Sequence, residues 1–449
     1  MLQPTKYPKV PELKTALPGP LSKTLIESDE KYTSPSYTRA YPLAVARGEG
    51  MLIEDYDGNV FLDFTAGIAV CSTGHCHPRI VAAIQNQAQH LIHMSGTDFY
   101  YGPQQELAEK LANIAPGNTP KKVFFTNSGA ESVEAAFKLA RFHTKRDKVI
   151  AFFGSFHGRT MGALSLTGSK AVQRRGFGPL IPGVIHIEYP NCYRCPLKTP
   201  GNPCCLKTLD HIEENLFPRI APPDEIAAVI VEPIQGEGGY IVPPPEFHQR
   251  LKAITEKHGI LYIADEVQSG MGRTGKMFAI EHWGVEPDIV CLAKGLASGM
   301  PLGAIVAKEQ IMDWPPGAHA STFGGNPVCC AASLETVALL EEGLVEHSAE
   351  MGFFLKSKLD QLATRHELIG EVRGLGLMLG VELVTDKFAK TPAKKERDAV
   401  VEICFRNGLL LLGCGDNAVR FAPPLIVEET DILTAVKIFD EALTELADG

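Results

Sequence analysis

Two short apolar segments decide the fold class of this chain: Ile260-Leu261-Tyr262-Ile263-Ala264, followed by Asp265-Glu266, and Ile289-Val290-Cys291-Leu292-Ala293, followed by Lys294. Short runs rich in Val or Ile are typical of strands buried on both faces of a parallel sheet. Further runs of this kind are Lys122–Thr126, Val149–Phe153, Ala227–Val231 and Ala304–Ala307. Segments with helical spacing of apolar residues, such as Glu131–Thr144 and Glu246–His258, separate them. We therefore predict an α/β fold with a large, mostly parallel sheet between helices.

The flanking regions predict a smaller α/β domain built from both termini. Residues up to about Ser36 are rich in Pro, Lys and Thr, and we expect them to form an arm that packs on something else. Strands are expected at Met51–Glu54 and Val60–Asp63. We assign residues 1–78 to this arm and part of the small domain, 79–330 to the large domain, and 331–449 to the C-terminal small domain. The elements expected in the C-terminal part are helices Val328–Glu342 and Ser348–Arg365, strands Gly376–Leu383 and Leu409–Leu412, and helix Thr430–Leu446.

Composition narrows the class of protein. The 449 residues carry a formal net charge of −10 with no basic block, so nucleic acid and anionic membranes are poor candidate partners. No apolar run approaches the roughly 18 residues that a membrane span needs, and the N-terminus lacks the apolar core of a signal peptide. The 11 cysteines, an odd number in a chain this long, indicate reduced thiols. We expect a cytoplasmic protein.

Three features suggest a cofactor site at one edge of the large sheet. Asp265 and Lys294 each close an apolar strand, and the carboxyl ends of parallel strands face the ligand crevice. A structural ion pair is the alternative interpretation. The turn Asn127-Ser128-Gly129-Ala130 precedes a helix, whose free N–H groups suit a phosphate, although a plain Ser128 cap with Glu131 also fits. A lysine amine, a carboxylate and a phosphate cradle together are what pyridoxal 5′-phosphate (PLP) requires.

Several motifs resemble the class III (ω-) aminotransferases of PLP fold type I. They are Asn127–Glu131, Phe156–Thr160, Glu232–Gly239, Asp265–Gln268, Gly272–Gly275, Lys294-Gly295 and Thr322–Pro327. The resemblance runs from about Tyr41 to the C-terminus. Within the family the chain looks most like the 4-aminobutyrate aminotransferases, and less closely like ornithine and acetylornithine aminotransferases.

The resemblance implies a role for each residue around the cofactor ring. Lys294 would bind PLP covalently and then move the proton between substrate and cofactor carbons. Asp265 would keep the pyridine nitrogen protonated. Phe156 would stack on one face of the ring, Val267 would pack on the other, and Gln268 would reach the ring's phenolic oxygen. Without the resemblance, Phe156 and Val267 would be interpreted as core residues.

The resemblance also implies how the phosphate is held. Ser128, Gly129 and Ala130 would bind it, helped by Thr322 from a partner subunit. Active sites shared in this way make the family homodimeric, and whether dimers pair into tetramers stays open.

Two arginines and a glutamate would bind the substrates. By resemblance, Arg159 and Arg420 bind carboxylates, for which a planar guanidinium is suited. Glu237 would pair with Arg420 for substrates without an α-carboxylate and swing aside for 2-oxoglutarate. The expected reaction is a ping-pong transfer of an amino group from 4-aminobutyrate, or a similar ω-amino acid or amine, to 2-oxoglutarate, giving semialdehyde and glutamate. The alternatives are an ornithine, lysine or acetylornithine aminotransferase, or an amino-acid racemase on the same scaffold.

Two further motifs are weighed and assigned no site. Gly270-Met271-Gly272-Arg273-Thr274-Gly275 fits the dinucleotide pattern G-x-G-x-x-G of a nicotinamide-dependent dehydrogenase, but it does not directly follow a strand and no clean helix opens after it. Cys192, Cys195, Cys204 and Cys205 could hold structural zinc, but their spacing is irregular, and we favour reduced thiols and no metal.

Overall fold

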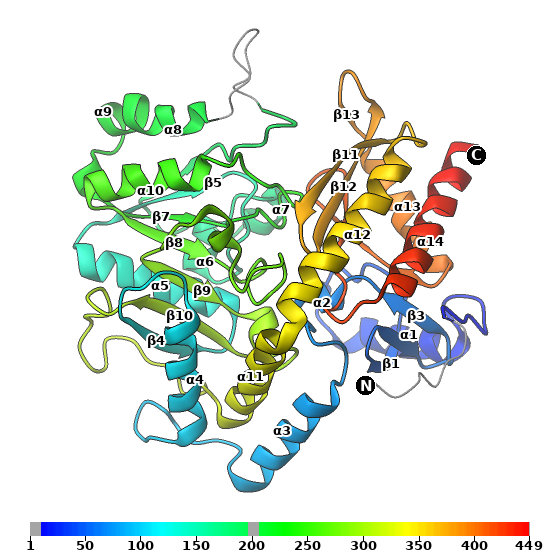
Figure 1. Cartoon of the computed structure of the whole chain (residues 1–449), viewed down its shortest axis with the longest axis horizontal. Coiled ribbons are helices and arrows are strands. Elements are labelled where there is room, and N and C mark those ends of the chain that lie inside the picture. Colours follow the sequence, from blue (N-terminus) through cyan, green and yellow to red (C-terminus); the bar gives the residue numbers. More distant parts are fainter. Residues whose placement is uncertain (1–9, 196–205, 449) are drawn as a thin grey trace.

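A mostly parallel sheet forms the larger lobe of the computed structural model, which describes residues 10–195 and 206–448 (Figure 1). Its seven described strands follow the order β4 (Lys121–Thr126), β10 (Gly303–Lys308), β9 (Ile289–Leu292), β8 (Leu261–Asp265), β7 (Ile226–Val231), β5 (Lys148–Phe152) and β6 (Val184–Ile187). Strand β10 is antiparallel to both neighbours, and the other pairs are parallel. The predicted fold class is confirmed.

Helices cover both faces of this sheet. Helix α5 (Gly129–Thr144) begins at the Ser128 cap and packs Val133 and Phe137 against one face, in a core shared with Ile263. Helix α10 (Phe247–His258) packs Phe247 and Leu251 on the other face, in the core that holds Tyr262. Because strands β7 to β9 are buried on both faces, they consist of near-continuous apolar residues, and this is why the sequence pattern revealed them.

The smaller lobe contains two antiparallel-rich sheets. One has the order β1 (Val45–Glu49), β2 (Leu52–Asp55), β3 (Val60–Asp63) and β14 (Leu409–Leu410), and the other has β11 (Ile369–Leu375), β12 (Met378–Asp386), β16 (Ala418–Phe421) and β15 (Leu412–Cys414), with β13 (Thr391–Pro392) paired to β12. Strand β14 runs parallel to β3, so the two ends of the chain share a sheet at that point. The other C-terminal strands form a sheet of their own.

The remaining helices connect and cover these sheets. They are α1 (Pro20–Tyr32), α2 (Ala66–Ala69), α3 (Pro78–His90), α4 (Gly102–Ile114), α6 (Met161–Leu166), α7 (Ala171–Arg174), α8 (Lys207–His211), α9 (Phe217–Arg219), α11 (Pro327–Leu339), α12 (Val345–Ala363), α13 (Lys394–Arg406) and α14 (Glu429–Asp448). Helix α12 runs along the boundary between the lobes (Figure 1). None of the helices in the described ranges is both long and apolar enough to cross a membrane.

The structure differs from the sequence prediction mainly in the smaller lobe. The predicted start of the strand Gly376–Leu383 is wrong, because Gly376 lies in the tight turn between β11 and β12, and β12 begins at Met378. The φ of Gly376 is +52°, and a Cβ there would overlap the backbone of Thr274. Helices α1 and α13 and strands β1, β6 and β16 had no prediction.

Candidate active site

Asp265 and Lys294 lie at the same edge of the large sheet. Asp265 is the last residue of β8 and is paired with Cys291 on the parallel neighbour β9, three positions before Lys294. Lys294 follows β9 with a φ of +46°, a left-handed conformation that a non-glycine residue rarely adopts. Such strain is typical of functional sites, where the surrounding packing holds the residue in place.

The environment of Lys294 favours an uncharged amine. Burial, reinforced by the positive charge of Arg420, lowers the pKa of Lys294 to about 8, and the carboxylates of Asp265, Glu237 and Glu232 act in the opposite direction. Near pH 8 a substantial fraction of the amine is therefore unprotonated. An unprotonated amine can act as a nucleophile or accept a proton.

Asp265 is held by a buried histidine that sequence reasoning treated as structural. Its Oδ2 lies 2.6 Å from Nδ1 of His157, and its Oδ1 accepts the backbone N–H of Val267 at 3.0 Å. Burial acts to lower the pKa of His157, but the Asp265 carboxylate outweighs it and the pKa is raised. Nε2 of His157 is buried with no hydrogen-bond partner among the described residues. The only sequence signal for this role was its place beside Phe156.

Glu232 is a second buried carboxyl group that had no individual role in the sequence prediction. Its Oε2 accepts the backbone N–H of Phe156 at 3.2 Å, and its Oε1 accepts that of Gly236 at 3.1 Å. Burial raises the pKa of Glu232 to about 7, with the Asp265 charge acting in the same direction. Glu232 therefore joins the segment that carries Phe156 to the turn that carries Glu237.

The N-terminus of α5 forms a cradle for an anion. Oγ of Ser128 accepts the N–H of Glu131 at 3.3 Å, so the helix cap that the sequence offered as an alternative is present. The N–H groups of Gly129 and Ala130 lie in the first helical turn, where they have no acceptor within the helix. A Cβ on Gly129 would lie 2.7 Å from Cγ1 of Val267, so a side chain at position 129 does not fit between this turn and Val267.

Four other predicted residues occupy different environments. Phe156 is half-buried, and the guanidinium of Arg159, which is exposed, lies 5.5 Å from the centre of its ring. Gln268 accepts a hydrogen bond from the Tyr240 hydroxyl at 2.9 Å. Thr322 is exposed in the loop before α11.

Glu237 and Arg420 form an ion pair between the two lobes. Nη1 of Arg420, on β16, lies 2.8 Å from Oε1 of Glu237. Burial acts to raise the pKa of Glu237, but Arg420 and Lys170 together hold it below its ordinary value. Arg420 is 7% exposed, and its Nε is a buried donor with no partner among the described residues. The guanidinium thus has unused capacity for a second anion.

Comparison with known proteins identifies the family. The model of the family "Aminotransferase class-III" matches residues 32–443. The chain belongs to the class-III aminotransferases. It is 40% identical to isoleucine 2-epimerase of Lentilactobacillus buchneri, covering 95% of this chain and 96% of the relative. It is also 40% identical to 4-aminobutyrate aminotransferase GabT of Escherichia coli, covering 90% and 94%. The solved ω-transaminase from Pseudomonas jessenii in complex with PMP has a TM-score of 0.88 at 33% identity, covering 94% and 98%.

The site of this class-III aminotransferase fits PLP, the cofactor of its family. The strained, partly buried Lys294, whose pKa is lowered, suits the cofactor's aldehyde. The Asp265 carboxylate, oriented by His157, suits its ring nitrogen, and the free N–H groups at the start of α5 suit its phosphate. No side chain fits at Gly129, which keeps the turn before α5 narrow.

The glycine run that resembles a dinucleotide motif has a different role in this aminotransferase. Residues 270–275 lie in mostly buried turns that do not directly follow strand β8 and do not open an α-helix. A Cβ on Gly272 would lie 2.9 Å from Leu340, and one on Gly275 would lie 2.8 Å from Ala349. These glycines permit close packing against helix α12 and its N-terminal extension. The nicotinamide alternative thus loses its structural basis.

The cysteine-rich loop lies partly outside the described residues. Cys192 is exposed and Cys195 is half-buried, whereas Cys204 and Cys205 are among the residues not described. Within 10–195 and 206–448, no group of three or more His, Cys, Asp or Glu side chains could hold a metal ion.

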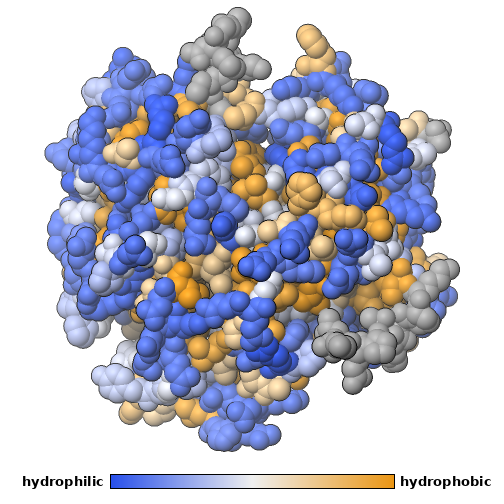
Figure 2. All heavy atoms as spheres, viewed as in Figure 1, coloured by the Kyte–Doolittle hydropathy of each residue, from blue (hydrophilic) through white to orange (hydrophobic). Residues whose placement is uncertain are grey.

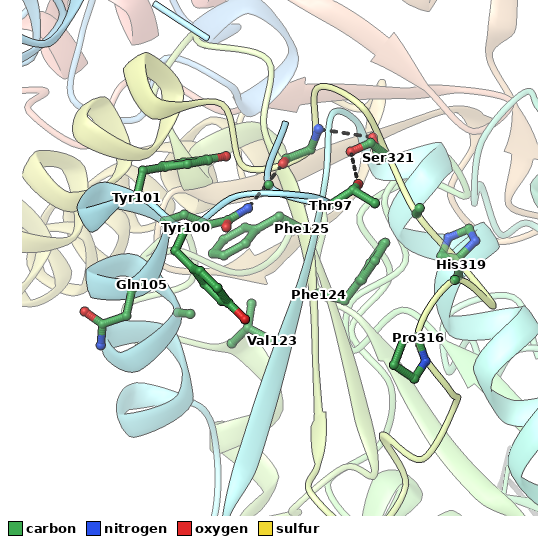
Figure 3. Close-up of a pocket in the computed structure, with 16 residues that line it drawn as sticks. Thr97, Tyr100, Tyr101, Gln105, Val123, Phe124, Phe125, Pro316, His319 and Ser321 are labelled. Atoms are coloured by element: carbon green, nitrogen blue, oxygen red, sulfur yellow. Dashed lines mark hydrogen bonds between the residues drawn. The ribbon is translucent and has the colours of Figure 1, made fainter. Parts of the chain in front are cut away.

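A surface pocket of about 370 Å³ lies near the turn that precedes α5 and is not lined by Lys294 (Figure 3). Figure 3 shows Tyr100 and His319 on opposite sides of it. Its Ser321 accepts a hydrogen bond from Nδ2 of Asn127 at 3.0 Å, which connects the pocket to the residue before Ser128. Thr322 follows Ser321 directly, so this pocket lies where the sequence predicted a contribution from a second subunit.

Proposed function

We propose that this class-III aminotransferase transfers an amino group from 4-aminobutyrate, or a similar ω-amino acid or amine, to 2-oxoglutarate in a ping-pong reaction that yields a semialdehyde and glutamate. The observation that carries the proposal is the Glu237–Arg420 ion pair, whose charges both influence Lys294. While Glu237 neutralises Arg420, the site accepts an amine without an α-carboxylate. When Glu237 moves away from Arg420, the free guanidinium accepts the carboxylate of a 2-oxo acid.

The residues of the chain divide the chemistry among them. Bound PLP supplies an electron sink for the carbanion formed at the substrate carbon. Nζ of Lys294 would move the proton from that carbon to the cofactor carbon, since its lowered pKa keeps the amine available near pH 8. Asp265, oriented by His157, places a negative charge at the ring nitrogen. Ser128, Gly129 and Ala130 bind the phosphate at the start of α5.

Two cationic residues orient the substrates in this proposal. Arg159, exposed beside the Phe156 ring, receives the distal carboxylate shared by donor and acceptor. Arg420 receives the α-carboxylate of the acceptor in place of Glu237. Phe156 and Val267 enclose the ring, and Gln268, fixed by Tyr240, reaches its phenolic oxygen.

We further propose that the protein works as a cytoplasmic homodimer with shared active sites. Phe323, which follows Thr322, is 60% exposed and lies 5.0 Å from the His93 ring, ring centre to ring centre. Phe99 and Ile92 of the same region are 52% and 66% exposed. Figure 2 shows apolar side chains gathered near the lower centre of this face, in the region of α3, α4 and α11. Apolar surface of this kind favours a partner, which would bring Thr322 to the neighbouring phosphate site.

The division into residues 1–78, 79–330 and 331–449 remains part of the proposal. The pairing of β14 with β3 supports a small domain built from both termini.

The visible absorption spectrum of the purified holoenzyme tests the function. A yellow band that bleaches with 4-aminobutyrate and returns with 2-oxoglutarate is the expected result. Bleaching by ornithine or acetylornithine but not by 4-aminobutyrate would keep the cofactor and change the donor. The absence of any band after incubation with PLP would contradict the whole proposal.

Racemisation is the second candidate function, because relatives of similar identity include an epimerase. Racemisation returns the proton to the carbon from which it was removed, so it needs no 2-oxo acid. Chiral chromatography of single-enantiomer isoleucine incubated with the enzyme, with no 2-oxo acid added, distinguishes the two. Formation of the other epimer identifies a racemase.

A further inference from the structure

The carboxylate of Glu237 contacts two cations, one from each lobe. Its Oε1 lies 2.8 Å from Nη1 of Arg420 on β16, and its Oε2 lies 3.2 Å from Nζ of Lys170. Lys170 directly precedes the short helix α7, on the side of the large lobe that faces β11 and β12 (Figure 1). Each oxygen of the carboxylate therefore has its own partner.

The backbone of Glu237 is fixed, so only its side chain is free to move. Its carbonyl oxygen accepts the N–H of Gly415 at 2.7 Å. Two residues later, the carbonyl oxygen of Gly239 accepts hydrogen bonds from Nε and Nη2 of Arg373 at 2.9 and 2.8 Å. A substrate carboxylate that takes Arg420 must therefore displace the Glu237 carboxylate by rotation of its side chain.

The two cations differ in their freedom to follow that rotation. The side chain of Arg420 is 9% exposed and packed among buried residues of β16, whereas the side chain of Lys170 is 43% exposed. Lysine carries its charge on a flexible stem with three rotatable donors. A carboxylate that left Arg420 with no other partner would be a partly desolvated, unpaired charge, which is costly. Lys170 removes this cost.

We propose that Lys170 is the ion-pair partner that retains Glu237 when a substrate carboxylate occupies Arg420, and that it thereby sets selectivity between substrates with and without an α-carboxylate. The inference rests on the proposed function in one respect, that Arg420 receives a substrate carboxylate. Lys170 is a positioning residue, because it acts through Glu237 and does not touch the reacting atoms.

Equilibrium binding to the holoenzyme tests the proposal without turnover. Glutarate represents the acceptor with two carboxylates, and butyrate represents the donor with one. In Lys170→Met, we expect the Kd for glutarate to rise about fivefold, the effect of losing one partly exposed ion pair, and the Kd for butyrate to change less than twofold. Lys170→Arg should restore glutarate binding. Lys356→Met is the matched control, because Lys356 forms a 2.8 Å ion pair with Asp360, one turn along α12, with both side chains similarly exposed.

A double-mutant cycle with Glu237→Ala separates the proposal from direct binding. Lys170→Met should have no further effect in that background, since the carboxylate that it retains is gone. A fivefold loss of glutarate affinity in both backgrounds would mean that Lys170 binds substrate itself, and would overturn the proposal. An unchanged ratio of the two Kd values in Lys170→Met would overturn it too.

Turnover keeps the two proposals distinguishable. If 4-aminobutyrate fails to bleach the visible band, the assigned donor is wrong, while the comparison of glutarate with butyrate still decides the role of Lys170. If both half-reactions proceed and Lys170→Met raises the KM of neither substrate, only the inference about Lys170 fails.

Discussion

The end of the large sheet and the contact between the lobes build two halves of one site in different ways. Asp265 and Lys294 follow adjacent parallel strands, so the sheet itself sets their separation. Glu237 and Arg420 are 183 positions apart, and side-chain ion pairs hold them together across the lobes. In the proposed mechanism, the first half carries the chemistry, whereas the second exchanges ion-pair partners and carries the specificity. Substitutions in the first half should therefore change rates for every substrate, and those in the second should change preferences.

The largest effect is expected for Lys294→Ala. A positioned general acid–base contributes about 10²–10⁴-fold to rate, and this variant would also lose the covalent attachment of the cofactor that we propose for Lys294. Steady-state transamination should fall by at least that factor for every donor and acceptor pair. Lys356→Met, which removes only an exposed ion pair within α12, should retain wild-type rates. Residual turnover near the wild-type level would show that Lys294 has no place in the mechanism.

The lowered pKa of Lys294 predicts how the apoenzyme captures PLP. Only the unprotonated amine attacks the cofactor aldehyde, so the capture rate should rise about tenfold per pH unit below the pKa and level off above about pH 8. Stopped-flow absorbance of the apoenzyme mixed with PLP over pH 6–10 measures this. A rate that still rises steeply to pH 10 would indicate a solvated lysine of ordinary pKa and would contradict the buried arrangement.

His157→Asn should lower kcat for all substrates by about 10–100-fold. Loss of a charge-assisted hydrogen bond is worth about 1.5–3 kcal/mol, and each 1.36 kcal/mol is about tenfold in rate. The pH profile of kcat should shift as well, because the histidine whose pKa Asp265 raises is replaced by an amide that does not titrate. His248→Asn is a matched control. His248 is equally buried, but it is bonded to Tyr262 and the Pro233 carbonyl, so its loss should lower stability and leave that profile unchanged.

Much of the first half, at the end of the large sheet, could be predicted from the sequence. The apolar runs before Asp265 and Lys294 identify strands locally, and a general rule about the carboxyl ends of parallel strands then places both residues at one edge. The Asp265–His157 contact could not be predicted, because it joins residues 108 positions apart and nothing near His157 indicates which strand end it meets.

The second half of the site, at the contact between the lobes, had much weaker signals in the sequence. Helix α13 begins with five consecutive charged residues, which conceals its buried face of Val400, Ile403 and Cys404. The predicted strand Gly376–Leu383 corresponds to β12, whereas β11, in which Glu371 and Arg373 interrupt the apolar residues, had no prediction. Glu237 and Arg420 were placed only by family resemblance, and the contact of Lys170 with Glu237 was not predicted at all, because an ion pair between distant loops has no periodic pattern.

The smallest effect is expected for Arg373→Lys, and it sharpens the distinction between the two halves. Lysine keeps a positive charge beside Glu371 and Glu382 but loses the planar fork that donates two hydrogen bonds to the Gly239 carbonyl. Each such bond contributes about 0.5–1.5 kcal/mol, so the loosened turn should change the ratio of kcat/KM for 2-oxoglutarate to that for 4-aminobutyrate by a few-fold. The PLP capture rate and its pH dependence should stay at wild-type values, because Arg373 does not contact the strands that carry Asp265 and Lys294. A change in capture of the same size as the change in selectivity would show that the two halves are mechanically coupled, and that the large sheet does not hold the chemistry independently of the smaller lobe.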